Sequence, residues 1–226
     1  MIDTFEPKLD ILPLAQRKLW EELVDVPAEF TLCGGTAVAL HLGHRESVDF
    51  DFFGTKEFSP VEFAEQIPFL RDATITQSEP NTISAVVDRG GPIKVSFFGL
   101  TKISLLKEPH VTKDIHLKVA SLLDLSGMKA AVVQKRAEKK DYLDIDAILT
   151  SGQINLPEAL AAAKAIYGGN FNPESTLKAL CYFGDGNVGS LPVDVKQRLV
   201  KAATQVDLDE MPVLDSLSKG NGGAKP

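Results

Sequence analysis

Two glycines and a threonine at residues 34–36 form a pattern that could bind phosphate. Gly34 and Gly35 end a short apolar segment, and Thr36 begins a stretch with helical periodicity. Glycine has no Cβ, so its backbone can approach an anion closely, and the first turn of a helix offers unpaired N–H groups. Thr36 adds a hydroxyl beside them. We therefore predict that Gly34, Gly35 and Thr36 contact phosphate groups.

Asp49 and Asp51 supply the second half of this candidate site. They are two positions apart in the alternating segment 48–53, so on a strand both carboxylates leave the same face. Two carboxylates so close together repel each other, and a divalent cation removes that cost. Carboxylates and substrate phosphates are the usual protein ligands of Mg²⁺. We therefore predict that Asp49 and Asp51 bind Mg²⁺ or Mn²⁺.

Each half of the site has a plainer interpretation when it stands alone. A Gly-Gly pair is most often only a turn, and an Asp-x-Asp on a strand is most often a solvated polar face. Here the two halves occur in order, with a short predicted helix between them. This arrangement favours a site over two unrelated surface features.

Lys129 and Arg136 form a second group that could bind phosphate. They are seven residues apart in a predicted helix, so we expect them on one helix face. Arg would bind a phosphate as a fork and Lys as a point charge. The alternative is a solvated face with ion pairs to Asp141 or Asp144, and spacing alone favours that alternative.

The elements that would position these residues form a mixed α/β pattern up to residue 120. Period-two alternation and short apolar runs predict strands, and periodicity near 3.6 predicts helices. The predicted strands are 30–33, 48–53, 73–78, 82–88 and 93–100, with an edge strand at 115–119. The predicted helices are 11–24, 36–42 and 60–70.

From residue 121 onward the pattern is helical. The predicted helices are 121–136, 138–150, 157–167, 174–183 and 192–205. We divide the chain into an α/β core (1–120), a helical region (121–212) and a tail (213–226) that we expect to be disordered. The fold class is α+β, a mixed sheet flanked by helices and followed by a helical C-terminal half. Whether the first two regions are separate domains stays open.

Composition excludes several classes of protein. The net charge of −7 disfavours strong non-specific binding to nucleic acid, which needs a basic surface. We expect no membrane segment, because no apolar run reaches 18 residues, and no secretory signal at the N-terminus. Cys33 and Cys181 are isolated, which is typical of reduced thiols in a cytoplasmic protein.

Two segments resemble the AbiEii/AbiGii-type family of nucleotidyltransferases, part of the DNA polymerase β-like superfamily. The first contains Gly34-Gly35-Thr36 and Asp49-Phe50-Asp51, and the second contains Met128-Lys129-Ala130, Arg136 and Lys140-Asp141-Tyr142-Leu143-Asp144. Arg45 and Ser47 also match. We interpret them as residues that hold the loop before Asp49 in position, with phosphate contact as the alternative.

The resemblance implies a nucleotidyltransferase-type fold and a Mg²⁺-dependent activity. The enzyme would move an NMP from an NTP to a hydroxyl of RNA (tRNA included), of a protein or of a small molecule. Asp49 and Asp51 would be metal ligands and catalytic residues. Lys129 would be catalytic and, with Arg136, would bind the nucleotide. The family is best known for the toxin component of toxin–antitoxin and phage-defence pairs, which implies an antitoxin protein as partner.

One position departs from the superfamily pattern. A third carboxylate generally stands on a later strand, where this chain has Ser96. Serine is a poor Mg²⁺ ligand. Asp88 lies across the predicted hairpin but adjoins its turn, and Asp114 and Asp124 are other conceivable substitutes without supporting spacing. Ser96 therefore favours an alternative function, a non-catalytic nucleotide- or metal-binding relative that acts as a regulator or partner subunit. A third alternative is an antibiotic-modifying nucleotidyltransferase.

Overall fold

The chain forms two compact units in the computed structural model, which describes residues 4–99, 103–215 and 217. Unit 1 comprises Met1–Ile103 and Pro109–Ala120, and unit 2 comprises Ser104–Glu108 and Ser121–Pro226. Most of the predicted tail, residues 216 and 218–226, lies outside the described residues.

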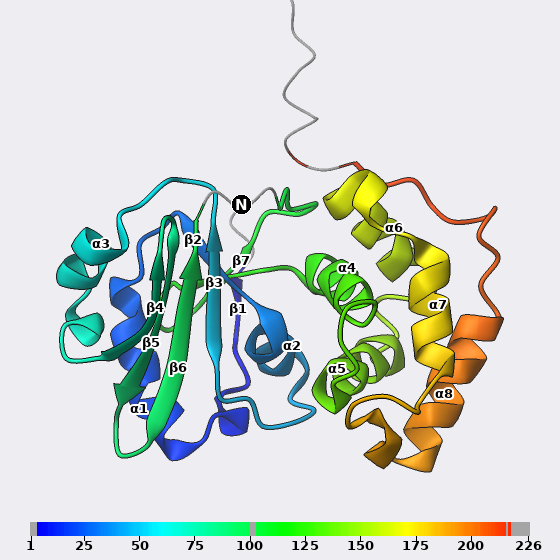
Figure 1. Cartoon of the computed structure of the whole chain (residues 1–226), viewed down its shortest axis with the longest axis horizontal. Helices are drawn as coiled ribbons and strands as arrows, with labels where there is room; N and C mark the ends of the chain where they lie inside the picture. The colour runs from blue at the N-terminus through cyan, green and yellow to red at the C-terminus, as the bar shows by residue number, and fades with distance from the viewer. Residues whose placement is uncertain (1–3, 100–102, 216, 218–226) are drawn as a thin grey trace, which may run out of the picture. The chain divides into compact units, whose positions relative to one another are not determined.

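Unit 1 contains a mixed sheet with the order β1-β7-β8-β2-β3-β6-β5-β4 (Figure 1). In chain order the described strands are β1 (Thr4–Phe5), β2 (Phe30–Cys33), β3 (Phe50–Gly54), β4 (Thr74–Glu79), β5 (Thr82–Asp88), β6 (Pro92–Phe98), β7 (His110–Thr112) and β8 (Lys118–Val119). β3 runs antiparallel to β2 and parallel to β6. Its central place gives it a paired neighbour on each side.

The residue register across the centre of the sheet aligns four small or polar residues. Asp51 pairs with Cys33 on β2 and with Ser96 on β6, and Ser96 pairs with Ser84 on β5. Paired residues on neighbouring strands point to the same face of a sheet. Asp51, Ser96 and Ser84 therefore form a polar row on one face.

The opposite face of β3 carries an aromatic core. Phe50 and Phe52 are fully buried, and Phe52 stacks on Phe97 with ring centroids 4.8 Å apart. Phe63 of α3 (Pro60–Gln66) packs edge-on against Phe97 at 4.8 Å, and Trp20 of α1 (Leu14–Trp20) lies 6.3 Å from Phe50. Each buried aromatic side chain contributes about 1.5–3 kcal/mol. This packing gives the strand that carries Asp51 a rigid base.

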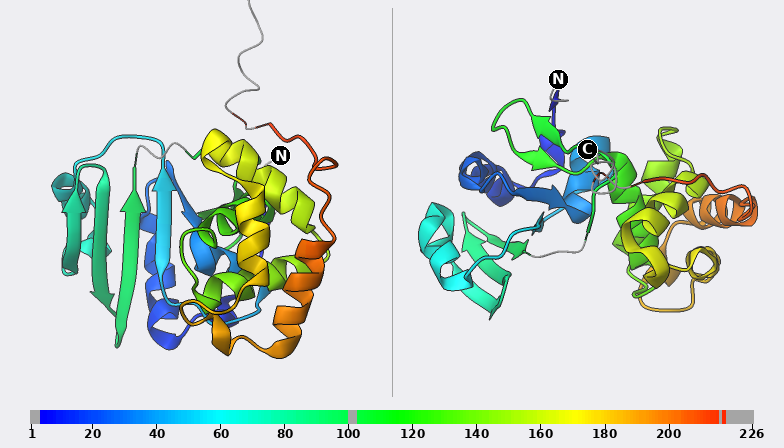
Figure 2. Two further views of the ribbon diagram at one scale, coloured as in Figure 1. Left: turned by 45° about the vertical axis from the view of Figure 1, so that its right-hand side comes forward. Right: turned by 90° about the horizontal axis from the view of Figure 1, so that it is seen from above.

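Unit 2 is a bundle of five helices among the residues described (Figures 1 and 2). They are α4 (Leu122–Val132), α5 (Lys139–Thr150), α6 (Leu156–Tyr167), α7 (Pro173–Cys181) and α8 (Val193–Thr204). α4 and α6 pack closely because Gly127 has no side chain. A Cβ there would lie 2.7 Å from the backbone nitrogen of Ala163. Asn155 and Glu158 form a capping box that fixes the start of α6.

The fold class predicted from the sequence is confirmed, and several element boundaries differ. α1 starts at Leu14 because Pro13 disfavours a helical conformation in the residue before it. Of the edge strand predicted at 115–119, only the two-residue β8 is observed, and it lies between β7 and β2 rather than at an edge. The segment His110–Thr112 is a strand that the pattern did not predict. No helix in the described part of the chain has the length and apolar character of a membrane span.

Candidate active site

Gly34 sits where β2 runs directly into α2 (Gly34–Leu42), and its backbone requires glycine. Its φ is +73°, in the left-handed region that L-residues with a side chain rarely adopt. A Cβ at this position would lie 3.1 Å from Oδ2 of Asp51. The glycine therefore allows the turn and also lets the Asp51 carboxylate approach the start of the helix.

Asp49 and Asp51 lie next to this helix start. Asp51 is on β3, and Asp49 immediately precedes the strand; both are half-buried. The predicted strand began at residue 48, but the observed strand begins at Phe50, because the carbonyl of Asp49 accepts a side-chain hydrogen bond from Thr36. The structure thus brings Gly34, Thr36, Asp49 and Asp51 together within unit 1.

The carboxylate oxygens of Asp49 and Asp51 suit a hard divalent cation such as Mg²⁺ or Mn²⁺ by their chemistry. Oxygen donors are the ligands these ions prefer, and Mg²⁺ usually keeps waters and substrate phosphates as its other ligands. Among the described residues, no group of three or more His, Cys, Asp or Glu side chains gathers around one point.

Ser96 occupies the position beside Asp51 on β6. It is buried, and its Oγ accepts a hydrogen bond from Oγ of Ser84 at 3.1 Å. The side chain that faces Asp51 from the next strand is thus a neutral hydroxyl. Sequence reasoning identified Ser96 but missed Ser84.

The three other aspartates considered as substitutes have structural partners. Asp88 accepts the backbone N–H groups of the β5–β6 turn, and Asp114 accepts the indole N–H of Trp20 at 2.7 Å. Asp124 is buried in unit 2 and accepts the backbone N–H of Leu106 at 2.6 Å. None of them is placed by an observed contact beside Asp49 or Asp51.

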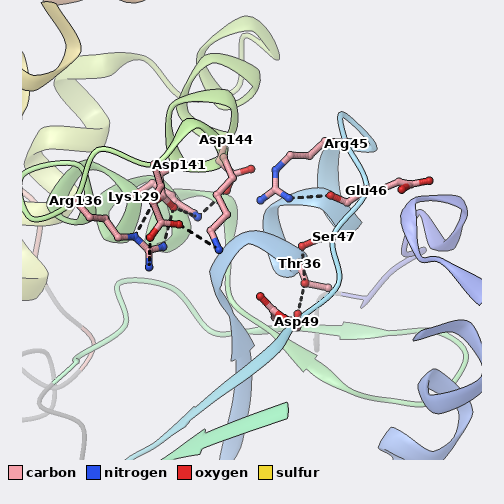
Figure 3. A network of polar contacts seen from close by, with 11 residues as sticks. Thr36, Arg45, Glu46, Ser47, Asp49, Lys129, Arg136, Asp141 and Asp144 are labelled. Atoms are coloured by element: carbon pink, nitrogen blue, oxygen red, sulfur yellow. Dashed lines mark hydrogen bonds and ion pairs between the residues drawn. The ribbon is translucent and has the colours of Figure 1, made fainter. Parts of the chain in front are cut away.

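Lys129 is the centre of a buried ion-pair group in unit 2 (Figure 3). Its Nζ lies 2.7 Å from Oδ1 of Asp141 and 2.6 Å from Oδ2 of Asp144. The Lys129 side chain is 6% exposed, and both carboxylates are 0% exposed. The ion pairs of Lys129 with Asp141 and Asp144 that the plainer interpretation expected are present. The expected solvated helix face is not, because the Lys129 side chain is buried.

Arg136 reaches the same group from outside the helix that carries Lys129. α4 ends at Val132, so the prediction that Lys129 and Arg136 share a helix face was wrong. The turn after α4 lets the Arg136 guanidinium reach the first turn of α5. Its Nε donates to Oδ2 of Asp141 at 2.8 Å and its Nη2 donates to Oδ1 at 3.2 Å. The side chain remains 46% exposed.

The charges in this group lower the pKa of the Asp141 carboxyl. Burial alone would raise that pKa, but the hydrogen bond from Arg136 and the charge of Lys129 outweigh burial. Two cations and two carboxylates balance formally, which makes their burial tolerable. The Asp141 carboxylate therefore stays ionised near neutral pH.

Comparisons with known proteins give a consistent picture. A family model described as "Nucleotidyl transferase AbiEii toxin, Type IV TA system" matches residues 18–212. An uncharacterized protein of Aquifex aeolicus (strain VF5) is 32% identical over 174 residues, which are 75% of this chain and 82% of that protein.

Two solved structures share the fold. The nucleotidyltransferase toxin MenT4 from Mycobacterium tuberculosis H37Rv superposes with a TM-score of 0.57 and 16% identity, covering 85% of this chain and 84% of that one. A protein from H. pylori, solved as a candidate nucleotidyltransferase, gives a TM-score of 0.53 and 17% identity, covering 84% and 90%.

Proposed function

Because the chain belongs to the AbiEii family of nucleotidyltransferase toxins, we propose that it is a metal-dependent enzyme that transfers an NMP from an NTP to an acceptor hydroxyl. The observation that carries this proposal is the approach of Asp51 to Gly34. It combines a carboxylate, a glycine turn and a helix start at one point of the sheet. Phosphates and a metal ion are the ligands that such a combination suits.

The residues of unit 1 would bind and orient the triphosphate. The backbone N–H groups of Gly34, Gly35 and Thr36 lie in the first turn of α2, where N–H groups lack an intrahelical acceptor. They would donate to phosphate oxygens. Asp49 and Asp51 would hold Mg²⁺, which when bound offsets the negative charge of the triphosphate.

The proposed reaction is a displacement at the α-phosphorus of the NTP. The acceptor oxygen forms a new bond to this phosphorus, and the bond to the bridging oxygen of the β-phosphate breaks. The acceptor proton leaves to solvent, and pyrophosphate departs with the electron pair. Positioning and charge stabilisation supply most of the catalysis in such reactions.

Lys129 and Arg136 are the proposed cations for the phosphates. The ammonium of Lys129 has three N–H donors, and Asp141 and Asp144 each lie within hydrogen-bond distance of it. The two carboxylates would fix the ammonium in one orientation. Arg136 is the more accessible cation of this group, since its side chain is 46% exposed.

Membership of the family supports a proposal for the acceptor and for the partner. We propose RNA (tRNA included), a protein or a small molecule as acceptor, and an antitoxin protein as the physiological partner. MenT4, which shares the fold, is itself a nucleotidyltransferase toxin. The proposed site is in the cytoplasm, where NTPs are abundant.

The test combines binding and transfer. Each of the four NTPs is titrated into the protein with Mg²⁺ by calorimetry, and α-labelled NTP is then incubated with total tRNA and with cell protein. The variant that combines Asp49→Asn with Asp51→Asn removes both charges with little change of shape. Asp72→Asn, at an exposed position of unit 1, is the matched control.

Three outcomes separate the candidate functions. Mg²⁺-dependent binding and label transfer, both lost in the double variant and kept in Asp72→Asn, support the enzyme. Binding without transfer to any acceptor supports the second candidate, a non-catalytic nucleotide-binding relative, which the hydroxyl of Ser96 beside Asp51 favours. Equal absence of binding in all three proteins contradicts both.

A further inference from the structure

Thr36 and Ser47 are two buried hydroxyl residues that connect α2 to the loop before β3 (Figure 3). The two Oγ atoms are 2.8 Å apart. Oγ1 of Thr36 also donates a hydrogen bond to the backbone carbonyl of Asp49. The side chains of residues 36 and 47 therefore contact the backbone of a proposed metal ligand.

The number of protons fixes the direction of these hydrogen bonds. A carbonyl oxygen can only accept, so the single hydroxyl proton of Thr36 goes to Asp49. Ser47 must then be the donor to Thr36. The chain runs from Ser47 through Thr36 to the Asp49 carbonyl, and each bond polarises the next one.

This direction leaves neither hydroxyl with a proton for a phosphate oxygen. The hydroxyl of Thr36 was predicted to help bind phosphate, but its donor is directed to a carbonyl. A phosphate at neutral pH needs donors. Only the backbone N–H of Thr36 could fill that role.

Both proposed metal ligands thereby contact the same turn of α2. Asp51 packs against Gly34, at the first residue of the helix, and the backbone of Asp49 is bonded to Thr36, two residues later. Two contacts from a single helical turn restrict how far the backbone of Asp49 can move relative to the Asp51 carboxylate. Metal affinity depends on the spacing between the carboxylates, because a divalent ion loses affinity when its ligands must move to reach it.

We propose that the Ser47–Thr36 hydroxyl pair positions Asp49 for metal binding, as a support of the metal site rather than as a ligand of the nucleotide. The proposal rests on the function proposed above, since it assigns metal binding to Asp49 and Asp51. It makes Ser47 part of the metal site through its hydrogen bond to Thr36.

Other contacts should keep the loop folded when the hydroxyls are removed. The backbone N–H of Ser47 donates to the carbonyl of Ile11 at 3.3 Å, and the side chain of Gln16 donates to the carbonyl of Val48 at 3.1 Å. Neither bond involves a hydroxyl. Removal of the Thr36 hydroxyl should therefore loosen Asp49 without releasing the loop.

The experiment measures Mn²⁺ binding by the full chain through the EPR signal of free Mn²⁺. Thr36→Val removes the hydroxyl with nearly the same shape, Thr36→Ser restores it, and Ser47→Ala removes only the donor to Thr36. Thr112→Val is the matched control, because Thr112 is also fully buried and hydrogen-bonded in unit 1 but lies on β7. Circular dichroism verifies that each variant is folded.

The loss of one positioning hydrogen bond should raise the Mn²⁺ Kd by about three- to tenfold in Thr36→Val. Thr36→Ser should stay within about twofold of wild type, and Ser47→Ala should fall between them because Thr36 keeps its bond to Asp49. Thr112→Val should leave the Kd unchanged. A structural role alone would lower the stability of Thr36→Val without changing the Kd.

Each other outcome contradicts a specific statement. A folded Thr36→Val with the wild-type Kd overturns the positioning role and leaves the metal site standing. If Thr36→Val does not fold, a wild-type Kd in Ser47→Ala overturns it. Wild-type protein that binds Mn²⁺ no better than the variant with Asp49→Asn and Asp51→Asn overturns the metal site and the proposed function with it.

Discussion

At the scale of single residues, position 34 requires glycine for two reasons that can be separated by experiment. Its φ of +73° disfavours any side chain, and a Cβ would press on Oδ2 of Asp51 at 3.1 Å. We predict that Gly34→Ala costs about 1–2 kcal/mol of unfolding free energy from the backbone alone. It should also weaken Mn²⁺ binding, because the Asp51 carboxylate must shift. Urea unfolding and the Mn²⁺ titration measure the two effects.

Gly152 provides the control for this prediction. Its φ is +72°, and a Cβ there would have no neighbour within 4 Å. Gly152→Ala should therefore lose a similar amount of stability and keep full Mn²⁺ affinity. Equal Mn²⁺ affinity in the two alanine variants would show that the contact between residue 34 and Asp51 has no role in metal binding.

Ser96 stands where a third carboxylate would be expected, so a variant at this position tests whether its side chain takes part in the reaction. Its Oγ already accepts a hydrogen bond from Ser84, which is a structural contact. We predict that Ser96→Ala keeps the NMP transfer rate within about threefold, since only a neutral hydrogen bond is lost. Steady-state transfer assays with labelled NTP measure this. A loss of a hundredfold or more would instead make the Ser96 hydroxyl part of the catalytic machinery.

At the scale of elements, the ion-pair group between α4 and α5 should make unit 2 sensitive to acid. The pKa of Asp141 is lowered below its ordinary value of 3.8. Its stabilisation is therefore present above pH 4 and lost as the pH falls through the lower folded-state value. We predict that Asp141→Asn loses about 3 kcal/mol at pH 7, and that its deficit relative to wild type shrinks below about pH 4. Urea unfolding between pH 3 and pH 7 measures the difference.

The pKa of Asp124 is shifted in the opposite direction to that of Asp141, so Asp124 serves as the control for the pH dependence. Burial raises its pKa despite hydrogen bonds from Leu106, Ser121 and Lys107. Its ionised form is therefore a cost above the raised folded-state value, and that cost falls as the pH drops toward 3.8. A deficit of Asp141→Asn that stays constant from pH 3 to pH 7 would contradict the assigned origin of its stability.

The predictability of these elements from sequence depends on whether their signal is local. The strand Phe30–Cys33 and the helix Lys139–Thr150 follow local apolar patterns and were predicted within one residue. The end of α4 at Val132 was not, because the chain turns there so that Arg136 can reach Asp141. The hydrogen bond from the Thr36 hydroxyl to Asp49 could not be predicted from the sequence either. It joins residues 13 apart, and neither side chain signals it in the pattern.

At the scale of the whole molecule, the chain leaves and re-enters unit 1. Ser104–Glu108 belongs to unit 2, Pro109–Ala120 returns to unit 1, and the rest of unit 2 starts at Ser121. The predicted boundary at residue 120 takes no account of the short segment 104–108. Asp124 connects this segment to α4, since its carboxylate accepts the backbone N–H groups of Leu106 and Lys107 at 2.6 Å and 3.3 Å.

The consequence can be tested with two fragments of the chain. A fragment of residues 121–226 lacks both backbone donors, and its Asp124 keeps only the hydrogen bonds of Ser121. A fragment of residues 104–226 keeps all of them. Hydrogen bonds to a charged group contribute about 1.5–3 kcal/mol each, so the longer fragment should unfold at a distinctly higher temperature. Adding Asp124→Asn to both fragments should reduce the difference, because the interaction of the segment with α4 depends on that charge. Equal Tm values for the two fragments, measured by circular dichroism, would mean that residues 104–108 do not stabilise the helical unit.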